Sequence, residues 1–235
     1  MKRFVTLLVL LVMLSMASVA QKVTPRVYYS DESGNVYEKD SIQDGQAPLV
    51  ATFKANPSEM GDKQPSFEWH FYKMNSGEGR REIVVRYEEE TQYTFMESGV
   101  YNIVLRTTLN DDNDVSELDS VTIIVTILES RLEFPNAFSP NGDGINDIYQ
   151  AKEGYKSIIS FHAIILNRWG QKLYEWDNPA GGWDGKFHGQ DVKQGVYFVQ
   201  VKAKGADGKD YLIRKDVNLL RGYTEKGNST TTGGQ

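Results

Sequence analysis

Apolar and polar residues alternate in short runs along most of this chain. Between residues 195 and 204, for example, Tyr197, Val199, Val201 and Ala203 occupy every second position. A period of two is typical of a strand with one buried face, and no long apolar stripe of period 3.6 indicates a helix. Glycine, proline, asparagine and aspartate separate the runs, as expected of turns between strands. The pattern predicts an all-β protein.

Several such runs follow one another in the first half of the chain after residue 20. Trp69 and Phe71 lie two residues apart and so share one face of their strand. Many short strands around a buried tryptophan are typical of a two-sheet, immunoglobulin-like sandwich. The predicted strands are Arg26–Tyr29, Leu49–Ala55, Phe67–Lys73, Arg81–Tyr87, Gln92–Phe95, Gly99–Leu109 and Ser120–Leu128.

The second half follows a short charged segment, Glu129–Glu133, and has fewer but longer runs. Asp207-Gly208 between the last two is a strong signal for a hairpin turn. We therefore expect two tandem immunoglobulin-like β-sandwich domains, at residues 21–129 and 130–222, with a disordered Gly/Thr-rich tail at 223–235. The predicted strands of the second domain are Ser157–Asn167, Lys172–Glu175, Gly195–Lys204 and Tyr211–Leu220.

Residues 1–20 have the composition of a secretory signal peptide. Lys2 and Arg3 precede an apolar run from Phe4 to Met16, and Ala17–Ala20 supplies small residues before an expected cut at Gln21. A membrane anchor is the alternative, but the apolar run is short for a span. We expect an exported protein with no transmembrane segment in the mature chain.

Composition narrows the function classes. The chain has no cysteine, which excludes disulfides, thiolate metal sites and cysteine nucleophiles. Residues 21–130 carry a net charge of −10 and residues 131–235 a net charge of +2. An acidic first domain argues against a nucleic-acid partner, since phosphates require a basic surface.

Motifs in the first domain resemble the PKD-type immunoglobulin-like domain. They are Pro48–Phe53, Phe67-Glu68-Trp69-His70-Phe71, Tyr93-Thr94-Phe95, Ser98-Gly99-Val100-Tyr101 and Val121-Thr122-Ile123-Ile124-Val125. His70-Phe71-Tyr72-Lys73 follows Trp69 where the family usually has an acidic turn, which makes this a divergent relative. The resemblance implies a spacer or adhesion module.

Four motifs in the second domain, in order, resemble the gliding motility-associated C-terminal domain over residues 134–222. The first is the loop Phe134–Asp147, rich in Asn, Asp, Gly and Pro, and the second is Ile165–Tyr174. The others are Gly182-Trp183-Asp184-Gly185 and Gln194–Phe198. The resemblance implies a cargo of the type IX secretion system that passes through the periplasm to the outer-membrane surface or the extracellular space. Residues 223–235 depart from the family, whose last strand usually ends the protein.

Outer-membrane components of that system are the implied partners, with other surface proteins or a polysaccharide as further candidates. Edge-strand addition is a plausible way for a sandwich to be recognised. The last predicted hairpin is basic, and an ordinary solvated hairpin is the alternative. The candidate partner-binding residues on it are Gly195, Tyr197, Lys202, Arg214 and Lys215.

One loop has the oxygen spacing of a calcium site. Asn141, Asp143 and Asp147 would occupy ligand positions of an EF-type loop, but Ser139 stands first and Gln150 last, where carboxylates are needed. The alternative is a structural loop in which Asn and Asp side chains bond the backbone. We favour the structural loop, keep Ca²⁺ as a candidate, and expect no other cofactor.

No motif indicates an enzyme. His70, His162 and His188 lack metal-ligand spacing, and the acidic runs at 88–90 and 111–114 are typical of solvated turns. Asp40-Ser41-Ile42 resembles a bacterial O-glycosylation acceptor, which makes Ser41 a candidate site. We expect a structural or adhesion protein of the cell surface, with an accessory of the gliding or secretion machinery as a further candidate. The alternative is a carbohydrate-binding module or small hydrolase, for which an exposed tryptophan row would be evidence.

Overall fold

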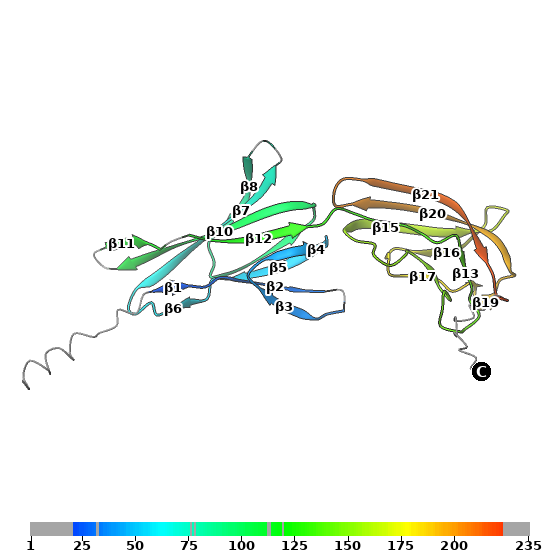
Figure 1. Ribbon diagram of the computed structural model, residues 1–235, viewed down its shortest axis with the longest axis horizontal. Helices are drawn as coiled ribbons and strands as arrows, with labels where there is room; N and C mark the ends of the chain where they lie inside the picture. The colour runs from blue at the N-terminus through cyan, green and yellow to red at the C-terminus, as the bar shows by residue number, and fades with distance from the viewer. Residues whose placement is uncertain are drawn as a thin grey trace, which may run out of the picture.

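The computed structural model describes residues 21–222, except residues 32, 76, 78, 112, 113 and 119. Every regular element of these residues is a β-strand, which confirms the all-β prediction. The strands form two groups that lie end to end (Figure 1). The predicted signal peptide and the predicted tail lie outside the described residues. No helix in the described part is long and apolar enough to cross a membrane.

The first domain is a sandwich of two antiparallel-rich sheets. One sheet has the order β3-β2-β5-β9, and the other has the order β4-β12-β10-β7-β8 with β11 added beside β10. The pair β1 (Lys22–Val23) and β6 (Pro57–Ser58) forms a separate small sheet. The remaining strands are β2 (Arg26–Ser30), β3 (Val36–Lys39), β4 (Ile42–Gly45), β5 (Leu49–Lys54), β7 (Gln64–Asn75), β8 (Gly79–Arg86), β9 (Glu90–Phe95), β10 (Gly99–Asp111), β11 (Asp114–Glu117) and β12 (Val121–Ile127).

Aromatic rings fill the core of this sandwich. Phe53 is fully buried, and its ring centroid lies 5.9 Å from Trp69, 5.3 Å from Phe71 and 6.4 Å from Phe95. Trp69 is also fully buried, and its indole N–H donates to the carbonyl of Glu88 at 3.0 Å. The prediction of a buried tryptophan on a strand shared with Phe71 is therefore confirmed.

The second domain has one large sheet and a cover of short elements. The sheet order is β13-β21-β20-β15-β16, and two-residue strands pair as β14-β17 and β18-β19 on separate small sheets. The strands are β13 (Ala137–Phe138), β14 (Tyr149–Gln150), β15 (Ile158–Leu166), β16 (Lys172–Trp176), β17 (Gly182–Trp183), β18 (Lys186–Phe187), β19 (Gln190–Asp191), β20 (Gly195–Gly205) and β21 (Asp210–Leu219).

Trp183 is the centre of the second core. It is fully buried and packs against Phe138 at 5.4 Å and Tyr197 at 5.1 Å between ring centroids. Its indole N–H donates to the carbonyl of Lys186 at 2.7 Å, so the only polar atom of the side chain is satisfied. Trp183, in β17, thus joins the short strands to β13 and β20 of the large sheet.

The turn between β20 and β21 connects the two domains. Asp207-Gly208 forms the predicted hairpin turn, and Ala206 within it packs into the core of the first domain. The backbone N–H of Ser98 donates to the Ala206 carbonyl at 3.0 Å, and the Ala47 N–H donates to the Ser157 hydroxyl at 3.3 Å. The two domains therefore share a hydrogen-bonded, partly apolar interface.

Candidate functional site

The loop at residues 139–147 is closed around the carboxylate of Asp147. This carboxylate accepts backbone N–H groups from Asn141 at 2.9 Å, Gly142 at 2.7 Å and Gly144 at 2.8 Å. These bonds, the one from Gly142 first, hold the pKa of Asp147 below its usual value. Gly142 and Gly144 have φ angles of 84° and 85°, which glycine adopts without steric cost.

The other two calcium candidates also bond the loop itself. The side-chain oxygen of Asn141 accepts the Asp143 N–H, and a carboxylate oxygen of Asp143 accepts the Ile145 N–H, both at 2.9 Å. These are Asx turns, which favour the structural interpretation of the loop. Within the described residues, no group of three or more His, Cys, Asp or Glu side chains is arranged to hold a metal ion.

Arg221 ties this loop to the rest of the second domain. Its guanidinium donates to the carbonyls of Pro140 at 2.8 Å, Gly185 at 2.7 Å and Val192 at 3.2 Å. Three loops far apart in sequence therefore meet on one side chain. A Cβ at Gly185 would lie 3.1 Å from the guanidinium, so this approach leaves almost no room for a side chain there.

The five candidate partner-binding residues differ in exposure, because strand register places their side chains on different faces of the sheet. Gly195, Lys202 and Arg214 are exposed. Tyr197 is buried, and its hydroxyl donates to the Lys193 carbonyl at 2.6 Å. Lys215 donates to the carbonyl of Phe134 and to the side chain of Asn136, and burial lowers its pKa.

Tyr197 is therefore buried and Lys215 half-buried, with their polar groups bonded inside the domain, and a partner role for either residue stays a prediction. Both occupy odd-numbered positions, whose side chains face the core. On the opposite face, which we call the outer face, exposed side chains include Val196 and Phe198 on β20 and Leu212 on β21. Sequence reasoning missed these residues, although the same alternation places them opposite the core.

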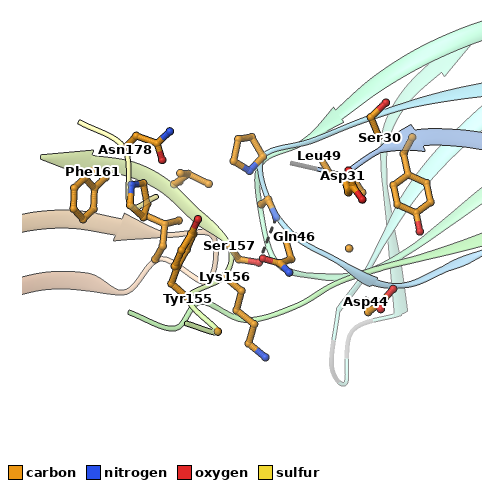
Figure 2. Close-up of a pocket in the computed structure, with 18 of the residues that line it drawn as sticks. Ser30, Asp31, Asp44, Gln46, Leu49, Tyr155, Lys156, Ser157, Phe161 and Asn178 are labelled. Carbon is orange, nitrogen blue, oxygen red and sulfur yellow. Dashed lines mark hydrogen bonds between the residues drawn. The ribbon is translucent and has the colours of Figure 1, made fainter. Parts of the chain in front are cut away.

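A cleft of about 1090 Å³ lies between the two domains (Figure 2). Tyr29 and Tyr37 stack at 5.4 Å on the first-domain side, and the Tyr37 hydroxyl donates to the Asp31 carboxylate at 2.8 Å. Hydrogen bonds, that from Asn35 first, lower the pKa of Asp31 to about 2, so the carboxylate is charged at neutral pH. Other lining residues include Asp44, Gln46, Glu153, Tyr155, Lys156, Phe161 and Asn178.

The remaining candidates are spread over the molecule. His70 lies between Glu68 and Glu82, at 3.2 and 3.0 Å, and His162 lies 2.6 Å from Asp177. Ser41 stands between β3 and β4 and is half-buried, beside Asp40, which is paired with Arg26. Modification of Ser41 stays a prediction.

Comparison with known families identifies the second domain. Residues 132–213 match the model of the CHU_C type IX secretion signal domain. No curated protein matches the chain. The match confirms the resemblance predicted for the second domain, while the PKD resemblance of the first domain stays a prediction. A type IX signal implies interaction with the secretion machinery and export to the cell surface or the extracellular space.

Proposed function

We propose that this protein is a non-enzymatic type IX cargo whose second domain directs export and surface attachment of a structural or adhesive β-sandwich. The single observation that carries the proposal is the match of residues 132–213 to the type IX secretion signal domain. The complete sheet and closed core of that domain support it, because a folded surface can be recognised as a unit.

The proposed mechanism depends on recognition, with no reacting group. The predicted signal peptide directs the chain across the inner membrane. The second domain then folds and presents its sheet and loops to the outer-membrane machinery, which passes the first domain to the outside. The first domain suits a structural role because its core is closed around Phe53 and Trp69.

Cell fractionation of the full chain in its natural host tests this proposal. In wild-type cells we expect the protein to be cleaved by protease added outside the cells. In a strain without a working type IX translocon, it should be protected and accumulate in the periplasm. Equal protease access in both strains would sink the proposal. The mass of the surface form also reports whether the second domain is retained.

A second candidate function is binding of a neutral oligosaccharide in the cleft between the domains. The stacked Tyr29–Tyr37 pair and the carboxylate and amide groups of Asp44 and Gln46 are the residue types that contact sugar rings and hydroxyls. Calorimetry of the purified mature chain with neutral oligosaccharides tests it. Binding that Tyr37→Ala abolishes and Tyr87→Ala, at an exposed tyrosine outside the cleft, preserves would support this function.

A further inference from the structure

The turn between β15 and β16 presents an exposed tryptophan on a fixed backbone. Trp169 is 75% exposed, the highest value of any large hydrophobic residue described. The side-chain oxygen of Asn167 accepts the N–H groups of Trp169 at 3.0 Å and of Gln171 at 3.1 Å. The Gly170 N–H donates to the Asn167 carbonyl at 3.0 Å, and its φ of 80° completes the turn. The indole is therefore held out in solvent by an ordered loop.

Arg168 lies against the same indole. Its guanidinium carbon lies 4.3 Å from the ring centroid, within the range of a cation–π contact. The contact places a cation against the ring, and most of the Trp169 side chain stays in solvent. Tryptophan and arginine are the residue types most enriched among the side chains that dominate protein–protein binding energy.

Exposed apolar side chains also lie next to this turn in the strand register of the large sheet. Leu166, at the end of β15, pairs with Phe198 on β20, so the turn follows directly on this row of the sheet. Phe198 is 42% exposed and Val196 is 50% exposed. We call Arg168, Trp169, Val196 and Phe198 the tip patch.

Its exposure sets Trp169 apart from the other tryptophans. The other tryptophans, Trp69, Trp176 and Trp183, are all buried. Water contact with a large aromatic side chain forgoes about 2 kcal/mol of burial free energy, which a binding partner could recover. Asp216 pairs across from Phe198, and the exposed basic residues Lys202 and Lys204 lie toward the opposite end of the outer face, so Arg168 is the basic residue of this end.

We propose that the tip patch is the contact through which the outer-membrane machinery of type IX secretion binds this domain. The inference rests on the proposed function and names the surface that performs it. The fitting partner is a folded protein with an apolar socket for the indole and carboxylates that pair with Arg168. A sugar-binding role fits less well because the residue beside the indole is a cation on a projecting turn, whereas sugar sites combine aromatic rings with carboxylates in concave surfaces.

Export of full-length variants in the natural host tests the inference. We expect Trp169→Ala to lower the protease-accessible surface fraction about tenfold, as the loss of a dominant contact residue implies, and to leave the protein in the periplasm. Arg168→Glu should act in the same direction. The matched control is Leu212→Ala, because Leu212 is 74% exposed on the same outer face at its opposite end. This control should be exported like the wild type.

Two further measurements make the outcome decisive. The thermal midpoints of purified Trp169→Ala and Arg168→Glu should equal that of the wild type, because both side chains are exposed. A photo-reactive amino acid at position 169 should cross-link to a component of the type IX translocon, and the same group at position 212 should not.

Normal export of both variants would overturn the inference while leaving the proposed function intact. Cross-links at position 169 that reach only lipid, glycan or a second copy of the chain would overturn it as well. Export of the wild type without the translocon would instead remove the proposed function itself. The two failures are thus distinguishable.

Discussion

At the scale of single residues, Arg221 determines where the second domain ends. The family match ends at residue 213, yet Arg221 bonds three loop carbonyls and lies 3.3 Å from Asp191. A guanidinium can serve several acceptors at fixed angles, and a lysine ammonium cannot reproduce that geometry. The folded unit therefore extends beyond the matched residues to at least Arg221.

We expect Arg221→Ala to lower the free energy of unfolding of the second domain by about 2 kcal/mol, because partly buried carbonyls lose charged donors. Arg221→Lys should recover only part of the loss. Chemical denaturation of the purified chain, followed by tryptophan fluorescence, measures the change. Arg214→Ala, on the outer face, serves as the control and should leave stability unchanged. Wild-type stability of Arg221→Ala would show that the three bonds contribute nothing.

Ionisation of the Asp147 carboxylate makes the stability of the second domain depend on pH. Its pKa is lowered in the folded state by backbone donors, so the stability it contributes is complete above its unfolded pKa and is lost as pH falls through the folded pKa. We expect Asp147→Asn to be less stable than the wild type at neutral pH and to match it more closely below about pH 4. Denaturation midpoints between pH 2 and pH 7 test this, with Asp216→Asn as the control. A constant difference across that pH range would contradict the assignment.

The same variant tests calcium binding. If the loop is structural, as its internal hydrogen bonds indicate, millimolar calcium should not change the thermal midpoint of either protein. A calcium-dependent rise that is present in the wild type and absent in Asp147→Asn would restore Asn141, Asp143 and Asp147 as metal ligands.

Two of the candidate partner-binding residues, Tyr197 and Lys215, lie on the inner face of the sheet, which the sequence prediction did not take into account. Tyr197 belongs to the same alternating apolar row as Val199 and Val201, so its burial could have been expected. Lys215 is different, because it interrupts an apolar face that includes Val217. Its burial depends on the Phe134 carbonyl and Asn136, two acceptors about eighty residues away that no local pattern identifies.

At the scale of elements, long alternating runs were predictable and short strands were not. The predicted strands Ser157–Asn167 and Gly195–Lys204 coincide closely with β15 and β20, because each buries one face of a large sheet. The two-residue strands β14 and β17 depend on packing around Trp183. β4 was missed because its polar sequence Ile42-Gln43-Asp44-Gly45 forms a strand only through parallel pairing with β12.

The β20–β21 turn depends on the absence of a side chain at Gly205. A Cβ at that position would overlap the side chains of Ser130 and Asp207. We expect Gly205→Ala to cost about 1–3 kcal/mol of stability, the range for a forced overlap in a packed site. Gly222→Ala is the matched control, since nothing lies within 4 Å of a Cβ there. Equal denaturation midpoints for both variants would mean that the turn rearranges to accept a Cβ at position 205 without loss of stability.

At the scale of the whole molecule, Ala206 belongs to the second domain by sequence and to the first core by packing. A charge at this position should therefore destabilise the domain that does not contain it. We expect Ala206→Glu to speed amide hydrogen exchange in β10 and β12 of the first domain. Lys209→Glu, in the same turn at an exposed residue, is the control. Faster exchange confined to β20 and β21 would rule out coupling between the domains.

The place of Ala206 also bears on what remains at the cell surface after export. A protease that cut between the domains, near Glu129, would leave the exported sandwich with an unfilled gap in its apolar interior. Trimming would therefore yield a less durable product than the intact chain. Removal of the second domain would also remove Ala206 from the core of the first domain. The form found on cells should therefore retain the mass of both domains.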